Sequence, residues 1–295
     1  MTYHIEVIDV NSKVVDDELR QLFKETFDMP GLLPSGYIRN NTMTKASSPS
    51  FFLAAKDDGK IIGSICFVAI DFFNGKQITT GYQICWGATH PKHQGRKVFI
   101  NIINYGKEYL RSKGAGFIFG LPSDQSYPIL IKKLGFIESP AVIVRIPNIP
   151  LVKNLFFKNA SSEIKHSEAD TIFAKEEQII ALKQQENREP IEIVRINESY
   201  CWGKLKSFKK FGMNINYFYL GGAFLKDPND YKMLVNKIFS QYHVFIVQIV
   251  SEESNSWNGM LNKWKKASMK GFIYFDLNGS LKKHMNIMYG IIDVF

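Results

Sequence analysis

The sequence predicts an α/β protein with a mixed sheet, arranged in two halves. Three observations support this. The chain has 295 residues, which is long for one compact domain and comfortable for two. Strand-like and helix-like segments alternate through the first half, some strands being joined by a hairpin and others by helices. The order strand, serine-rich turn, helix and Gly-Phe at residues 117–136 recurs at residues 245–272, although coincidence is the alternative for so short a pattern.

In the first half, alternating or continuous apolar runs predict strands and apolar residues three or four apart predict helices. The strands span residues 4–10, 51–55, 61–71, 77–89, 117–121 and 141–146, and the helices residues 16–27, 97–113 and 126–134. Gly114 and Gly135 stand where the second and third helices are expected to end. Residues 29–50 are rich in Pro, Gly, Ser and Asn, so we predict a long loop of the kind that carries binding residues.

The same patterns divide the rest of the chain. A proline-flanked polar arm at residues 148–170 separates a domain of residues 1–147 from one of residues 171–295. The second domain is expected to contain the helices 175–187, 231–240 and 256–267 and the strands 192–196, 214–220, 243–250 and 285–295. It is predicted to be a weakened copy of the first domain.

Composition limits the classes of function. Hydrophobic residues make up 45% of the chain and charged residues 22%, as in a soluble globular protein, and no run of eighteen apolar residues predicts a membrane span. The N-terminus has no signal-peptide pattern, and three scattered cysteines without a CxxC pair predict a cytoplasmic protein with reduced thiols and no metal. The net charge is +9, but the lysines occur singly or in pairs without an RNA-binding motif. A phosphorylated small ligand is therefore favoured over nucleic acid.

The most informative segment joins the strand 77–89 to the helix 97–113. The first turn of a helix has backbone N–H groups without partners and the positive end of the helix dipole, and both favour a phosphate. In this loop Gly95 permits close backbone approach, and Arg96 and Lys97 add positive charge. The sequence therefore predicts a phosphate-binding turn here.

This loop resembles that of the GNAT superfamily of acetyl-CoA-dependent N-acetyltransferases, whose pattern is Gln/Arg-x-x-Gly-x-Gly/Ala. Gln94 matches the first position and Gly95 follows it, whereas Lys97 stands where a glycine is expected and Phe99 where a small residue is common. A following strand and a helix ending in Leu-Gly-Phe at residues 134–136 also match the family. The turn after the strand is similar to that of a subgroup that modifies surface polysaccharides and sugars.

The resemblance implies acetyl-CoA as acyl donor and a small-molecule amine, first of all an amino sugar, as acceptor. It implies that coenzyme A is bound by Ala88, Thr89, Gln94, Gly95, Arg96, Lys97, Val98 and Phe99. The amine would attack the thioester directly, so the protein must accept a proton from the amine and donate one to the thiolate.

The residues for these proton transfers are less clear from the sequence. The family's usual tyrosine acid is replaced by Ile131, so Tyr127, one helical turn earlier, and Ser126 are the candidate acids. His90 is the candidate base. The alternative for Tyr127 is a packing role, and for His93 a surface or phosphate contact. The residues suggested for the acceptor cleft are Tyr37, Arg39, Asp71, Tyr82, Trp86 and Asp293, each of which has a structural alternative.

The second half lacks the phosphate-binding loop, because Asp227 and Asp230 at its helix start would repel a phosphate and cap their own helix. We therefore expect a degenerate GNAT-like domain that shapes the acceptor cleft or the surface of a possible homodimer. Two other functions remain open. One is a non-catalytic acyl-CoA-binding or scaffold protein, and the other is a Fem-type aminoacyl transferase, for which the chain shows no paired-helix arm.

Overall fold

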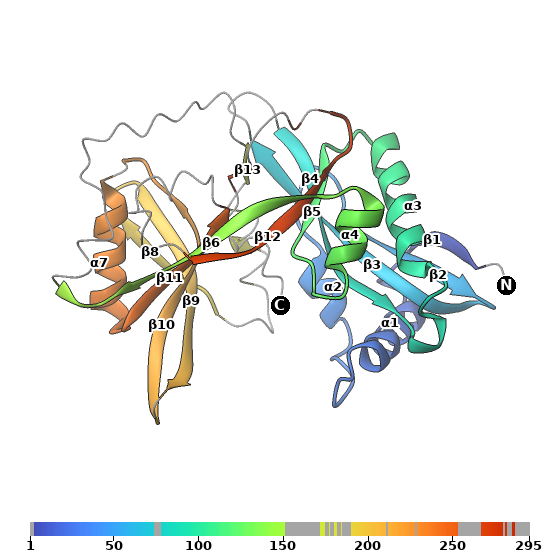
Figure 1. Ribbon diagram of the computed structural model, residues 1–295, viewed down its shortest axis with the longest axis horizontal. Coiled ribbons are helices and arrows are strands. Elements are labelled where there is room, and N and C mark those ends of the chain that lie inside the picture. Colours follow the sequence, from blue (N-terminus) through green and yellow to red (C-terminus); the bar gives the residue numbers. More distant parts are fainter. Residues whose placement is uncertain are drawn as a thin grey trace.

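A computed structural model of the chain describes residues 3–73, 78–150, 190–210, 212–227, 229–252 and 267–279, with short stretches at 172–174, 180–181 and 285–286 and residues 177, 184 and 281. Within these residues, 13 strands form one sheet in the order β1-β2-β3-β4-β5-β12-β6-β11-β10-β9-β8, with β7 and β13 beside it. Figure 1 shows two lobes, one with α1 to α4 and one with α7, joined across the middle by β6 and β12.

The first lobe confirms most of the predicted elements, with shifts of a few residues at their ends. Its strands are β1 (His4–Ile8), β2 (Phe51–Asp57), β3 (Lys60–Phe73), β4 (Ile78–Thr89), β5 (Phe117–Gly120) and β6 (Ile137–Pro147). Its helices are α1 (Lys13–Thr26), α2 (Tyr37–Thr42), α3 (Val98–Ser112) and α4 (Tyr127–Leu134), with the short 3₁₀ turn η1 at Pro91–His93. Gly114 and Gly135 follow their helices at φ values of 71° and 67°, a conformation that glycine adopts without strain.

The second lobe repeats the topology of the first. Its elements are β8 (Glu192–Ile196), β9 (Ser199–Lys210), β10 (Met213–Phe224), α7 (Asp230–Tyr242), β11 (Ile246–Glu252) and β12 (Ala267–Asp276). The hairpin β3–β4 leads through α3 to a parallel β5, and the hairpin β9–β10 leads through α7 to a parallel β11. The two halves are thus two copies of one strand-hairpin-helix-strand arrangement.

The two copies exchange their last strands. β6, which follows β5 along the chain, lies antiparallel to β11 of the second copy, and β12, which follows β11, lies antiparallel to β5 of the first. β6 and β12 also pair with each other, which joins the two half-sheets into one. β6 therefore completes the half-sheet of the second copy, and β12 completes that of the first. The domain boundary expected at residue 147 stays a proposal.

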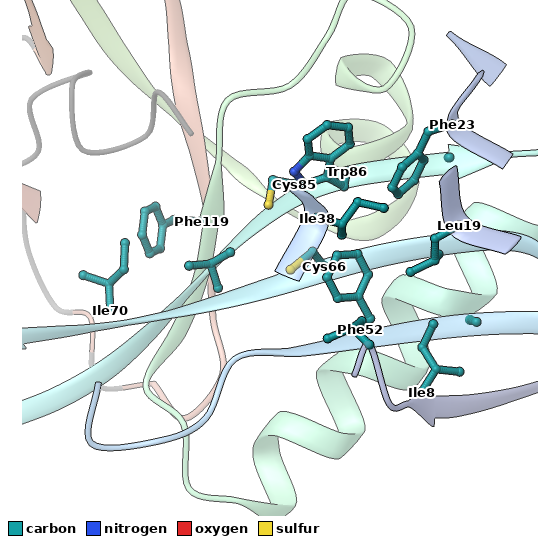
Figure 2. Close-up of a cluster of buried hydrophobic side chains, with 14 of the residues drawn as sticks. Ile8, Leu19, Phe23, Ile38, Phe52, Cys66, Ile70, Cys85, Trp86 and Phe119 are labelled. Atoms are coloured by element: carbon teal, nitrogen blue, oxygen red, sulfur yellow. The ribbon is translucent and has the colours of Figure 1, made fainter. Parts of the chain in front are cut away.

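Each face of the sheet carries its own hydrophobic core. One cluster packs α1 and α2 against the sheet through Leu19, Phe23 and Ile38. Figure 2 shows these side chains beside Phe52 and Trp86. On the opposite face, α3 and α4 pack through residues such as Ile102 and Leu130, and α7 covers the same face in the second lobe through a third cluster.

Three elements differ from the sequence predictions. The loop 29–50 contains the six-residue helix α2, and the long strand β9 had no predicted counterpart. Ala267, the last residue of the expected helix 256–267, instead begins the strand β12. The linker interior, most of the expected helix 175–187, residues 253–266 and the C-terminal residues 287–295 lie outside the described residues. Two short strands lie next to these regions: β7 (Ile172–Ala174) follows the linker interior, and β13 (Met285–Asn286) precedes the C-terminal residues.

A buried lysine links the exchanged strand to the first lobe. Lys107 of α3 is only 6% exposed, its ammonium donates a hydrogen bond to the carbonyl of Leu134 at the end of α4, and its Nζ lies 3.7 Å from the ring centroid of Phe275 in β12. Burial, followed by repulsion from Arg111, lowers its pKa from 10.5 to about 8. These two contacts hold α3, α4 and β12 together around one cation.

This lysine predicts a pH dependence of stability. Between the folded pKa of about 8 and the unfolded value of 10.5, the unfolded chain binds the extra proton, so stability rises with pH across this window. We expect the rise in the free energy of unfolding, measured by urea titration from pH 7.5 to 10, to be smaller in a Lys107→Met variant. Equal slopes in both proteins would contradict the assignment.

Candidate active site

The site begins where β4 and β5 separate. The parallel pairing of the two strands covers Gly81 to Gln83 on β4 and ends there, while β4 continues to Thr89. Beyond Gln83 the backbone edge of β4 that faces away from β3 has no strand partner among the described residues. A ligand with amide groups can add to such an edge as a further strand would.

A β-bulge lies on β4 at this separation. Ser64 of β3 pairs with Ala88 and Cys66 pairs with Cys85, so Ile65 faces both Trp86 and Gly87. Trp86 adopts φ 53°, a strained conformation for a bulky residue, and its indole packs 4.9 Å from the ring of Phe23 (Figure 2). Bulges redirect backbone groups out of the ladder, and this one lies on the stretch of β4 beyond its pairing with β5.

The loop that follows β4 is braced by side chains of its own and of β2. Both terminal guanidinium nitrogens of Arg96 lie 3.2 Å from a carboxylate oxygen of Asp57, and one of them lies 2.5 Å from Nδ1 of His93. His93 therefore accepts from Arg96 and helps to hold the loop. The guanidinium of Arg96, which was predicted to meet a phosphate, is bound within the protein.

Lys97 and the start of α3 form the part of the loop that the sequence predicts to bind a phosphate. Lys97 is the N-cap of α3 at φ 60°, and Gly95 has φ 78° with open space around it. This explains why glycine is favoured at position 97 in the family pattern, since the backbone is left-handed there. The first intrahelical bond runs from Asn101 N–H to the Lys97 carbonyl, so the N–H groups of residues 98–100 point out of the helix start toward the loop.

The charge of this turn is carried by lysine. Lys97 is exposed and makes no ion pair with any residue that the structure describes, and Gln94 and Gly95 are exposed beside it. Val98 is buried, whereas Phe99 is half-buried and faces the gap between the strands. The turn thus offers backbone donors, a helix dipole and one available cation to an anion.

A cavity of about 680 Å³ passes through the sheet at the gap. Ile65, Ile84 and Phe99 line it on the face covered by α3 and α4, and Cys85 and Trp86 line it on the face covered by α1. A ligand entering beside α3 therefore reaches the opposite face of the sheet through the gap. The volume suits a long thin arm together with a small second molecule.

The second lobe forms part of the cavity wall. Lys206 of β9, Tyr219 of β10 and Gln248 of β11 line the cavity together with Ile143 of β6 and Val250 of β11. Sequence reasoning missed these residues, because only the exchange of β6 and β12 brings them beside β4. The remaining lining residues are Phe27, Gln83, Gly87, Leu121, Pro122, Ser123, Ser126 and Leu130.

The three predicted catalytic residues are not brought together. Ser126 lines the cavity, and its hydroxyl lies 3.0 Å from that of Ser123. The cavity lining includes neither His90 nor Tyr127. His90 accepts a hydrogen bond from the Lys92 N–H and its Nε2 lies 2.8 Å from a carboxylate oxygen of Glu25, so both ring nitrogens have partners. The Tyr127 hydroxyl donates to Glu138, and this hydrogen bond raises the pKa of Tyr127.

Of the residues suggested for the acceptor cleft, Trp86 lines the cavity. Asp71 instead accepts hydrogen bonds from the backbone and hydroxyl of Ser47 and from Thr80, and so fixes the loop before β2. Tyr82 packs against Phe51, and Tyr37 lies with its ring edge toward Trp86. Arg39 is exposed on α2, and Asp293 lies outside the described residues.

The corresponding place in the second lobe is closed. β10 also has a bulge, at Gly221, but the indole of Trp202 lies against Gly221 and Gly222 and is only 2% exposed. At the start of α7, the carboxylate of Asp230 accepts hydrogen bonds from Asn197 and Ser199. A buried indole and a buried carboxylate thus occupy the positions that the gap and the start of α3 have in the first lobe.

The described residues contain no group of three or more His, Cys, Asp or Glu side chains placed to hold a metal ion. In the same part of the chain, no helix is both long enough and apolar enough to span a bilayer.

The separated parallel strands, the bulge and the open helix start lie in the first half of the chain, and this half is similar to a GNAT acetyltransferase domain. The family model described as acetyltransferase (GNAT) domain matches residues 16–136. None of the curated proteins compared with the chain matches it.

Solved structures show the fold over nearly the whole chain. A GCN5-related N-acetyltransferase from Anabaena variabilis aligns with a TM-score of 0.62 at 12% identity, covering 93% of this chain and 73% of that one. Eis1 from Mycobacterium abscessus aligns with a TM-score of 0.59 at 12% identity, covering 94% and 74%. A putative acetyltransferase from Pyrococcus horikoshii gives 0.53 at 15% identity, covering 99% and 95%. At these identities the likeness concerns the fold alone, and it extends through both lobes.

Proposed function

We propose that the protein transfers an acetyl group from acetyl-CoA to the amine of a small molecule by direct attack. The observation that carries this proposal is the cavity that runs from the start of α3 through the gap between β4 and β5 to the opposite face of the sheet. The pyrophosphate of coenzyme A would bind at residues 94–98, where backbone N–H groups and Lys97 meet it. The pantetheine arm would follow the unpaired edge of β4.

The bulge at Trp86 and Gly87 would then act on the thioester. Trp86 and Gly87 line the cavity, and a backbone N–H of the bulge would stabilise the negative charge that develops on the thioester oxygen. The acceptor amine would approach from the face lined by Cys85, Trp86 and the second lobe. An amino sugar remains one candidate for this acceptor.

One observation favours a second function, an acyl-CoA-binding protein without catalysis. The described residues that line the cavity include no histidine and no carboxylate, so no ordinary general base faces the gap directly. Proton transfer by direct attack would then have to use water, Ser126 or Tyr219. Cys66 is no substitute, because burial raises the pKa of its thiol and keeps it protonated.

Isothermal titration and thiol release separate these functions. We expect acetyl-CoA and desulfo-coenzyme A to bind with one site per chain, and coenzyme A thiol to be released when amines are added. Binding without thiol release across an amine panel would favour the non-catalytic protein. No binding of either ligand would exclude both functions.

A charge reversal tests the phosphate-binding turn. We expect Lys97→Glu to raise the Kd for acetyl-CoA by about ten-fold or more at low salt, because it places a carboxylate beside the pyrophosphate. Since the effect is electrostatic, it should shrink as ionic strength rises. Lys113→Glu, at the other end of α3, is the control and should leave the Kd unchanged. Equal affinities of the Lys97→Glu and Lys113→Glu variants would place the phosphate elsewhere.

A further inference from the structure

The cavity has a polar end built by the second lobe. Strand alternation directs Tyr219 and Gln248 to the face away from α7, because their chain neighbours Leu220, Val247 and Ile249 lie in the α7 core. Lys206 lies on the same face, because it pairs with Tyr217, which is next to Phe218 of that core. Tyr219 and Gln248 are paired across β10 and β11, and Gln248 is paired with Arg145 of β6. The polar side chains therefore form a compact group on one surface of the sheet.

Lys206 is the one charged side chain among the described residues that line the cavity. It is half-buried, and its Nζ lies 5.5 Å from the ring centroid of Tyr219. No carboxylate in the described part of the chain forms an ion pair with it. A partly desolvated cation without an anionic partner attracts one strongly.

Gln248 adds a hydrogen-bond donor whose orientation is fixed. Arg145 Nε donates to its Oε1 at 2.9 Å, so the carbonyl end of the amide is engaged. The NH₂ end is then the part of Gln248 that a ligand in the cavity meets. Lys206 and Gln248 thus both present donors, and Arg145 adds a second positive charge behind Gln248.

We propose that the acceptor amine also carries an anionic group, a carboxylate or a phosphate, and that Lys206 and Gln248 bind this group. The inference rests on the proposed acyl transfer and specifies its substrate class. Charge-assisted hydrogen bonds from an ammonium and an amide suit the oxygens of either anion, whereas a purely cationic amine would be repelled by Lys206.

The anion in question is distinct from the pyrophosphate of coenzyme A. The turn at Lys97 opens on the face covered by α3 and α4, whereas Lys206 and Gln248 lie on the other face, beside Cys85 and Trp86. The gap between β4 and β5 separates the two sites. A single cavity therefore holds a donor site at one end and a site for an anionic acceptor at the other.

Amines that differ only by the anionic group provide the test. The pairs are L-lysine with cadaverine, L-tyrosine with tyramine, and glucosamine 6-phosphate with glucosamine; the first two report a carboxylate and the third a phosphate. Binding of each amine to the protein saturated with desulfo-coenzyme A is measured by calorimetry, and kcat/KM by thiol release from acetyl-CoA. We expect the anionic member of at least one pair to bind about ten-fold more tightly than its partner.

Variants locate the effect. Lys206→Glu should abolish the preference for the anionic member while leaving the Kd for acetyl-CoA within about two-fold of the wild-type value. Lys209→Glu makes the same charge change at an exposed position of β9 outside the cavity and should keep the preference. Normal acetyl-CoA binding with no tighter binding of any anionic member, or a preference that survives Lys206→Glu, would overturn the acceptor proposal alone. Failure of acetyl-CoA to bind would overturn the proposed function, and the acceptor proposal with it.

Discussion

Replacing Gly271 with alanine is expected to lower the free energy of unfolding by about 3 kcal/mol or more. A Cβ at this position would lie 1.6 Å from the backbone carbonyl oxygen of Ser139 in β6. Gly271 lies at the register shift between Met269 and Phe272 in the pairing with β6, just before the pairing of β12 with β5 begins at Ile273. The backbone cannot move away without breaking the pairing that joins the two lobes.

Urea denaturation followed by circular dichroism measures this loss. Gly31→Ala is the matched control, because Gly31 has open space around it and no left-handed φ, and we expect a change within about 0.5 kcal/mol. A Gly271→Ala protein as stable as the Gly31→Ala protein would show that β6 and β12 are not packed as described.

The second large effect concerns the donor site. We expect Gly95→Pro to raise the Kd for acetyl-CoA by about thirty-fold or more, because proline fixes φ near −65° whereas Gly95 has φ 78°. The loop would then rebuild its path into α3 and withdraw its backbone donors. Gly95→Ala retains access to the left-handed region at a cost of about 1–2 kcal/mol, so its effect should be smaller.

Calorimetry with acetyl-CoA measures both variants, and thermal unfolding provides the control. The loop is exposed and Gly95 has no neighbour within 4 Å of an added Cβ, so the folded core should be little affected. An unchanged Kd in the proline variant would refute the binding turn, provided that its unfolding curve matches the wild type.

Local patterns were sufficient to predict most of the first lobe. The structure confirms the predicted hairpin of β2 and β3, whose turn is formed by Asp58 and Gly59 with positive φ values. It also confirms α3, whose apolar residues repeat at helical spacing. The helix α2 was missed, since six residues within a segment rich in Pro, Gly and Ser give too short a pattern.

The candidate site likewise has one part that local sequence predicts and another that depends on the pairing of distant strands. The loop at residues 94–99 follows from a contiguous segment, so its position at the start of α3 was predictable. The wall formed by Lys206, Tyr219 and Gln248 depends on which strands are neighbours, and no local pattern reveals that β6 pairs with β11 and β12 with β5. The alternation of polar and apolar residues in β9 was the available signal, and recognition of that strand would have placed Lys206 on the face opposite Cys201.

The exchange of β6 and β12 also has a consequence for biosynthesis. β5 (Phe117–Gly120) leaves the ribosome long before its partner β12 (Ala267–Asp276), so the edge of β5 that β12 covers has no such partner in the meantime. Such edges recruit strands from other molecules, and long-range pairings form slowly. A nascent chain of this protein therefore depends on protection of that edge until β12 emerges, and the cavity wall contributed by β9, β10 and β11 forms later than the loop at residues 94–98.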